Sequence, residues 1–131
     1  MKFRNVLWAS DFDGTLKNDE GSITPDVIEK VKYFISEGGF FTVCTGRIHQ
    51  GFHLYDPEYI NAPVLLGNGA MAYDYKADKV IFNDAIGDEG LKSIYDILNE
   101  FPEICIEFYN FNKVCAINLN EHSEQHFTSQ G

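Results

Sequence analysis

The chain has 131 residues, enough for one domain of ordinary size, and 44% of them are hydrophobic, which argues against disorder by composition. Its net charge of −10 disfavours nucleic acid or an anionic membrane as a partner. No segment approaches the roughly 20 apolar residues of a membrane span. The three cysteines include no Cys-x-x-Cys pair, so neither a disulfide framework nor a zinc ribbon is indicated. We therefore expect a cytoplasmic protein with neither nucleic-acid nor membrane partners.

The first expected strand covers residues 4–9, and two carboxylates follow it. Its short apolar run predicts a central parallel strand that is buried on both faces. Asp11 and Asp13 come next, at the edge where open α/β sheets bind ligands, and Gly14 allows a sharp turn. There, one carboxylate can attack phosphorus while the other transfers protons, and Mg²⁺ would offset their charge. The alternative is that both acids only cap an Asp-Gly turn.

The next elements predict a parallel βαβ unit. Thr24-Pro25-Asp26 is typical of a helix start, and Gly38-Gly39 of a helix end. The apolar run 40–44 then predicts a second strand. A right-handed crossover would place it parallel to the first.

The second strand ends in Thr45-Gly46-Arg47, which we expect beside Asp11. A hydroxyl and a free amide at this edge can hold phosphoryl oxygens, and an arginine can add a bidentate contact. Taken alone, the tripeptide is as typical of a helix cap, and a helix is expected over residues 47–54.

The third expected strand, residues 63–66, also ends in a polar, glycine-rich turn. Asn68 and Gly69 lie in that turn, at the same sheet edge. An ordinary Asn-Gly turn is the alternative.

The pattern changes after residue 70. A hairpin is expected over residues 71–82, followed by a helix from residue 88 and two strands near 104–108 and 114–119. Strands followed by a helix and more strands indicate an α+β arrangement, so we place a second unit after the hairpin. The predicted division is 1–83 and 84–131.

Together, these motifs resemble those of the haloacid dehalogenase-like hydrolases. Residues 11–16 read DFDGTL, like the first motif of that family, and Thr45-Gly46-Arg47 resembles its second motif in the Cof-type sugar-phosphatase branch. The resemblance covers only the N-terminal half of the family's architecture. It implies an α/β fold: a Rossmann-type parallel sheet with three core strands, followed by part of an α+β cap.

The resemblance also implies an activity and site residues. The expected enzyme is a Mg²⁺-dependent phosphatase that hydrolyses small phosphate monoesters, such as sugar phosphates, through an aspartyl-phosphate. Asp11 would be the nucleophile and Asp13 the general acid and base, and the Asp11 carboxylate and the Asp13 main-chain carbonyl would bind Mg²⁺. The expected phosphate- and substrate-binding residues are Gly14, Thr15, Thr45, Gly46, Arg47, Asn68 and Gly69.

Two parts of the family's site have no counterpart after residue 120. They are a lysine that neutralises the nucleophile and a Gly-Asp-x-x-x-Asp motif that binds the metal; Lys113 is a poor substitute for the lysine. We therefore interpret the chain as part of a longer phosphatase and expect little activity from these residues alone. The alternative is a non-catalytic chain that only binds phosphate or self-associates through an open, apolar edge at its first strand.

Three other interpretations are weaker. A response-regulator receiver would carry a phospho-acceptor Asp after the third strand, where this chain has Gly67-Asn68. The histidine pairs 49/53 and 122/126 have zinc-ligand spacing but lack the Glu of HExxH. Asp84, Asp88 and Glu89 are better explained as a hairpin end and a helix start than as a metal site.

Overall fold

The computed structural model describes residues 1–52 and 55–124. These residues divide into two compact units, one from Met1 to Asp84 and one from Ala85 onward. Every residue expected in the site belongs to the first unit. That the two units are a core and a cap remains a prediction.

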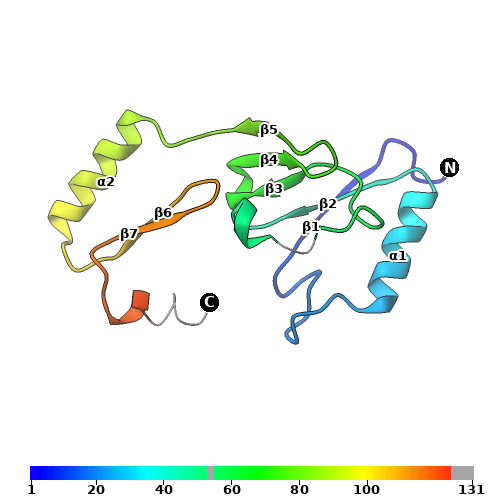
Figure 1. Cartoon of the computed structure of the whole chain (residues 1–131), viewed down its shortest axis with the longest axis horizontal. Helices are drawn as coiled ribbons and strands as arrows, with labels where there is room; N and C mark the ends of the chain where they lie inside the picture. Colours follow the sequence, from blue (N-terminus) through cyan, green and yellow to red (C-terminus); the bar gives the residue numbers. More distant parts are fainter. Residues whose placement is uncertain (53–54, 125–131) are drawn as a thin grey trace. The chain divides into compact units, whose positions relative to one another are not determined.

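The first unit is a five-stranded sheet in the order β1-β2-β3-β4-β5 with one α-helix (Figure 1). The strands β1, β2 and β3 are parallel, and β3, β4 and β5 are antiparallel. The three parallel core strands and the following hairpin are thus confirmed. The elements are β1 (Leu7–Asp11), α1 (Pro25–Ser36), β2 (Phe40–Cys44), β3 (Val64–Leu66), β4 (Met71–Asp74) and β5 (Lys79–Asn83).

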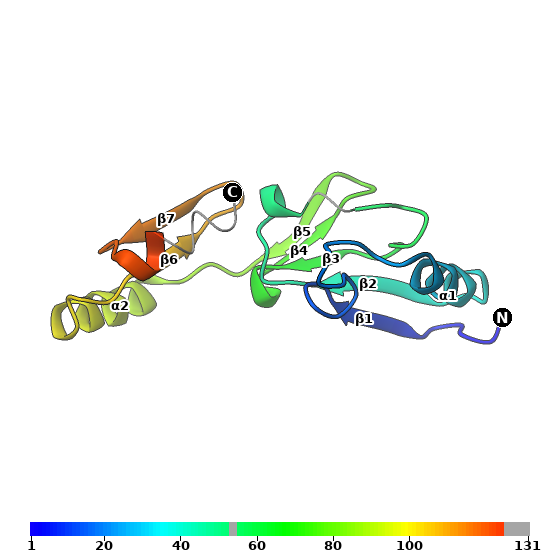
Figure 2. The same ribbon diagram turned by 90° about the horizontal axis from the view of Figure 1, so that it is seen from below.

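The helix α1 lies beside β1 and β2, as Figures 1 and 2 show, and starts where predicted because Pro25 occupies its first turn. Thr24 is the N-cap residue by position, but its side chain makes no capping hydrogen bond. The Phe34 ring is buried and meets Trp8 edge to face at 5.6 Å. A Cβ atom at Gly39 would lie 2.4 Å from that ring, so the chain needs a glycine where it leaves the helix.

The strand β2 is held on its β3 side by a side chain as well as by backbone pairing. The Asn61 side chain accepts a hydrogen bond from the Phe41 amide (2.7 Å) and donates one to the Gly39 carbonyl (3.1 Å). The Asn61 amide also donates to the Phe41 carbonyl (3.1 Å). Asn61 therefore acts like an additional strand residue. It fixes the position of β2 along the sheet, just before β3 begins.

The prediction that the first strand is buried on both faces is wrong. In the described chain β1 pairs only with β2, so it is an edge strand. Leu7 is 62% exposed and Trp8 is 45% exposed. The predicted open apolar edge is therefore present.

The helix expected over residues 47–54 is also not seen in its described part. Residues 47–52 contain only a short 3₁₀ turn, His49–Gly51; residues 53 and 54 lie outside the described ranges, as does His126. Gly51 has low helix propensity, and its carbonyl accepts a hydrogen bond from the Arg47 side chain. That bond favours a tight local turn.

The second unit contains α2 (Asp88–Glu100) and an antiparallel hairpin of β6 (Ile106–Tyr109) and β7 (Val114–Ile117). The helix is amphipathic as predicted, but it contains no buried residue. Its apolar side chains Leu91 and Tyr95 are 48% and 66% exposed. No helix in the described ranges is long and apolar enough to span a membrane.

Candidate active site

The ends of the three parallel strands lie level with one another. Asp11 is paired with Cys44 across β1 and β2, and Cys44 with Leu65 across β2 and β3. The segments that follow these strands therefore leave the sheet at one edge. This is the edge at which the sequence predicts the phosphate-binding residues.

The loop after β1 presents two carboxylates on either side of a buried ring. Phe12 is 1% exposed, whereas Asp11 and Asp13 are both exposed. Gly14 has φ +73°, a left-handed conformation that favours glycine, and it lets the chain turn back. The Lys17 amide then donates to the Phe12 carbonyl at 2.8 Å and closes the loop. Burial of Phe12 thus directs both acids to the surface.

The Asp11 carboxylate is oriented by Thr15, whose hydroxyl donates a hydrogen bond to Asp11 Oδ2 at 3.0 Å. Asp11 also acts electrostatically on the neighbouring strand. Burial, and secondly the Asp11 charge, raise the pKa of the Cys44 thiol. The Asp11 charge is therefore felt at Cys44, the last residue of β2.

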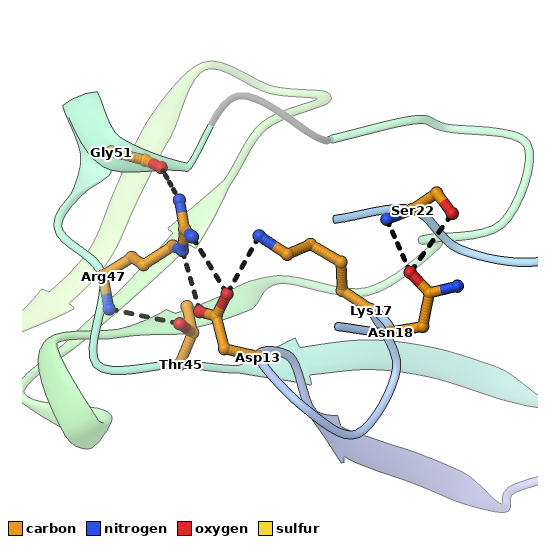
Figure 3. Close-up of polar contacts among 7 residues, drawn as sticks. All are labelled: Asp13, Lys17, Asn18, Ser22, Thr45, Arg47 and Gly51. Atoms are coloured by element: carbon orange, nitrogen blue, oxygen red, sulfur yellow. Dashed lines mark hydrogen bonds and ion pairs between the residues drawn. The ribbon is translucent and has the colours of Figure 1, made fainter. Parts of the chain in front are cut away.

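Asp13 lies between two cations (Figure 3). Arg47 Nε donates to Asp13 Oδ2 at 2.8 Å, and Arg47 Nη2 donates to Asp13 Oδ1 at 2.9 Å. Lys17 Nζ lies 3.2 Å from Asp13 Oδ1. Hydrogen bonding from Arg47 is the main reason that the pKa of Asp13 is lowered, and Lys17 acts in the same direction. The ionised carboxylate is therefore the favoured form.

Arg47 is itself held from two further directions. Its Nη1 donates to the Gly51 carbonyl at 3.0 Å, and its guanidinium carbon lies 5.6 Å from the centre of the Phe12 ring. Lys17 Nζ lies at the same distance from that ring. The predicted contact between Arg47 and a substrate phosphate remains a prediction, because in this structure the guanidinium is bound to Asp13.

The second and third strand ends meet through Asn68. The Thr45 side chain is buried, and its hydroxyl accepts a hydrogen bond from the Arg47 amide at 3.1 Å. The Asn68 amide donates to the Thr45 carbonyl at 3.0 Å. A Cβ atom at Gly46 would lie 3.2 Å from Asn68 Oδ1, so the Asn68 side chain covers Gly46 closely. The backbone is left-handed at both Asn68 (φ +56°) and Gly69 (φ +92°).

Lys17 is a site residue that the sequence analysis missed. Its side chain is only 19% exposed, although lysine is normally a surface residue. The available signal was its spacing four residues after Asp13, in the turn that the DFDGTL motif opens. That spacing brings the two side chains together here because the Lys17 amide binds the Phe12 carbonyl.

The donor set fits Mg²⁺ in part. Asp11 would supply a carboxylate and Asp13 a main-chain carbonyl, and Mg²⁺ prefers such oxygen ligands while keeping several of its waters. Within the described ranges, no group of three or more His, Cys, Asp or Glu residues is arranged to hold a metal ion. The described residues therefore offer two of the ligands that a Mg²⁺ ion would need. When bound, the ion would offset the negative charge of the acids and of a phosphate.

At the carboxyl ends of the three parallel strands lie two acids, a threonine and glycine-rich turns, and this is the edge at which open α/β sheets bind ligands. The chain belongs to the haloacid dehalogenase-like hydrolase family, whose family model matches residues 8–130.

Individual relatives agree with this assignment. The chain is 30% identical over 93 residues to the pyridoxal phosphate phosphatase YbhA of Escherichia coli, a match that covers 70% of this chain and 34% of YbhA. It superposes on the phosphatase BT1666 of Bacteroides thetaiotaomicron with a TM-score of 0.81 and 23% identity, covering 98% of this chain and 47% of that one. For the subclass IIB sugar phosphatase BT4131 the TM-score is 0.77 at 22% identity, with 95% and 48% covered. Both superpositions support the fold.

The matches also show how much of the family's architecture is present. The chain spans between 34% and 42% of the length of the curated relatives that it matches. The expected resemblance to the N-terminal half of the family is thereby confirmed.

Proposed function

We propose that this chain forms part of a Mg²⁺-dependent phosphatase in which Asp11 is the nucleophile. The observation that carries the proposal is the position of the Asp11 carboxylate. The Asp11 backbone lies level with the ends of β2 and β3, and its carboxylate is oriented by the Thr15 hydroxyl at 3.0 Å. Family membership supports the same reaction class.

The proposed reaction has two displacement steps. An Asp11 oxygen attacks phosphorus, the bond to the ester oxygen breaks, and the departing alcohol receives a proton from Asp13. Asp13 then removes a proton from water, the water oxygen attacks phosphorus, and the bond to Asp11 breaks to release phosphate. Thr45, Gly46 and the turn at Asn68 would hold the phosphoryl oxygens during both steps. Mg²⁺ at Asp11 and Asp13 would supply charge neutralisation.

The substrates that we propose are small phosphate monoesters. Two relatives support this class: one is named a pyridoxal phosphate phosphatase and one a sugar phosphatase. The cytoplasmic location remains a prediction from the sequence.

Trapping of the phosphorylated state tests the proposal. Beryllofluoride with Mg²⁺ should bind to the protein and mimic the aspartyl-phosphate, and Asp11→Asn should abolish binding because it removes the attacking oxygen. A chain extended to the length of the relatives should hydrolyse p-nitrophenyl phosphate only with Mg²⁺. If the extended chain shows no Mg²⁺-dependent turnover, the proposal is wrong.

A second candidate function is association without catalysis. The exposed edge of β1 favours it, because an unpaired strand with apolar side chains can add a strand from another chain. Dimers that form through β1, together with failure of beryllofluoride to bind, would favour this candidate over the phosphatase.

A further inference from the structure

We propose that the rings of Phe52 and Tyr75 position Asp13 to remove a proton from the attacking water, because they hold the turn whose Gly51 carbonyl binds Arg47. This inference rests on the role proposed above for Asp13. Neither ring belongs to the residues expected in the site, and neither touches Asp13. Their action would pass through Gly51 and Arg47.

Phe52 joins the acidic loop to the β4–β5 hairpin. It is 3% exposed and meets the Phe12 ring edge to face at 5.1 Å. On its other side it meets the ring of Tyr75, which follows β4, at 5.7 Å. A line of rings therefore runs from Phe12, between the two acids, to the turn between β4 and β5.

Tyr75 also holds the beginning of the same turn. Its ring stacks on His49 at 5.3 Å with an angle of 10° between the planes, and on Tyr55 at 4.8 Å and 17°. Two residues of this region therefore pack on Tyr75: His49, which begins the turn, and Phe52, which follows its last residue, Gly51. Burial raises the pKa of the Tyr75 hydroxyl to about 12, so the ring remains neutral at physiological pH.

Two backbone hydrogen bonds close the turn in the part of the chain that the structure describes. The Gly51 amide donates to the Ile48 carbonyl at 3.0 Å, and the Phe52 amide donates to the His49 carbonyl at 3.3 Å. A single 3₁₀ turn of this kind has little stability of its own. Packing of the two rings is therefore what keeps the Gly51 carbonyl 3.0 Å from Arg47 Nη1.

Arg47 in turn requires an anchor to hold Asp13. Its side chain is 38% exposed, and an exposed arginine loses rotamer freedom when it is held in one geometry. The third hydrogen bond to Gly51 and the contact with the Phe12 ring restrict the guanidinium before it meets Asp13. Both the bond to Gly51 and the contact with Phe12 depend on Phe52. Its ring packs on the Phe12 ring, and its backbone directly follows Gly51.

The arrangement could also be ordinary core packing, and a matched variant separates the two explanations. Phe34→Leu removes the same atoms as Phe52→Leu from another buried ring, one on α1 that packs on Phe3 and Trp8 instead of on the acidic loop. Both variants lower the stability of the fold. Only Phe52→Leu should loosen Arg47.

The measurement is solvent exchange of the Arg47 Nε–H proton in ¹H–¹⁵N NMR spectra of this chain, with Arg47→Lys used to assign the signal. In Phe52→Leu we expect exchange to rise about tenfold or more, as when a hydrogen bond to a charged group is weakened. Phe34→Leu should leave the rate within about twofold of the parent protein, as for a distant, independent site. Tyr75→Leu should act like Phe52→Leu and serves as the test if Phe52→Leu prevents folding.

Equal exchange rates in the Phe52 and Phe34 variants would overturn the inference, as would an unchanged rate in both the Phe52 and Tyr75 variants. The readout does not depend on turnover. A failure of beryllofluoride to bind would contradict the proposed function and leave the exchange result to be judged on its own.

Discussion

Arg47 and Asp13, 34 residues apart in the sequence, form a bidentate ion pair that joins the segments after β1 and β2. Each carboxylate oxygen of Asp13 accepts one hydrogen bond from the guanidinium. The pair favours the charged form of Asp13, which suits removal of a proton from water and opposes donation of a proton to a leaving group. A substrate that draws Arg47 away would therefore help the first step of the proposed reaction.

The contribution of this pair to stability should depend on pH. The pKa of Asp13 in the folded chain lies below its ordinary value of 3.8. The stabilisation is then fully present above that ordinary value and is lost as the pH falls through the lower, folded value. Arg47→Met should lower the free energy of unfolding by about 0.2–1 kcal/mol at neutral pH, the range for exposed ion pairs, and by less near pH 2. Urea unfolding at the two pH values measures the difference.

The ion pair between Lys30 and Asp26 on α1 provides the control. It joins side chains that are 66% and 78% exposed, with 3.7 Å between the charged atoms. Lys30→Met should change stability little at either pH. An equal effect of Arg47→Met at both pH values would show that its guanidinium acts through packing on Phe12 instead of through its charge.

Gly46→Ala should weaken binding of inorganic phosphate in the presence of Mg²⁺. The added methyl group would lie 3.2 Å from Asn68 Oδ1 and would push the Asn68 side chain away from the strand ends. Gly51→Ala is the matched change, because there the nearest atoms lie 3.9 Å away and the methyl group fits. Isothermal titration calorimetry compares the two affinities. Similar losses in both variants would contradict a specific role for the contact between Gly46 and Asn68.

Asn61→Ala should destabilise the fold by about 1–3 kcal/mol, the cost of leaving buried hydrogen-bonding groups without a partner. The groups affected are the Phe41 amide and the Gly39 carbonyl. Asn18→Ala removes a similar side chain from an exposed loop, where water can replace the bonds to Ser22, and should cost less. Denaturant unfolding of both variants measures the difference. If Asn61→Ala lowers the free energy of unfolding no more than Asn18→Ala does, backbone pairing alone fixes the position of β2.

Self-association should depend on the edge of β1. A charge on an exposed edge strand disfavours pairing with another chain, so Leu7→Lys should shift the chain toward the monomer. Val80→Lys places the same charge on β5, at the opposite edge of the sheet. Size-exclusion chromatography with light scattering over a range of concentrations determines the mass. Dimers that persist in Leu7→Lys and disappear in Val80→Lys would assign the contact to β5.

The elements that the sequence predicted well were those with strong local signals. Pro25 marks the start of α1 and Gly38-Gly39 its end, and the apolar runs 40–44 and 63–66 give β2 and β3. The polar residues after these strands could be placed at one edge because parallel strands share a direction. That reasoning brought Asp11 and Thr45 to the same edge without coordinates.

The errors came from contacts between distant parts of the chain. Apolar residues in β1 indicated burial on both faces, but burial depends on what covers those faces, and in the described chain Leu7 and Trp8 are 62% and 45% exposed on an edge strand. The contact of Arg47 with a phosphate remains a prediction; what the sequence did not indicate is the ion pair with Asp13, a carboxylate that the loop after β1 carries within reach of Arg47. Lys17 gave only its spacing from Asp13, and Asn61 gave no motif at all, since its role depends on backbone groups that only the folded chain brings near it.

Because the Phe12 ring is buried between the two acids, ligand binding at the site should be lost when the protein unfolds on heating. The two acids stand on either side of a side chain that is 1% exposed, so they keep their places only while the core around that ring is intact. During heating, the capacity to bind beryllofluoride should therefore vanish in the same cooperative transition as the near-ultraviolet circular dichroism of the aromatic core. Loss of ligand capacity well before that transition would mean that the acidic loop can open while the ring stays in place.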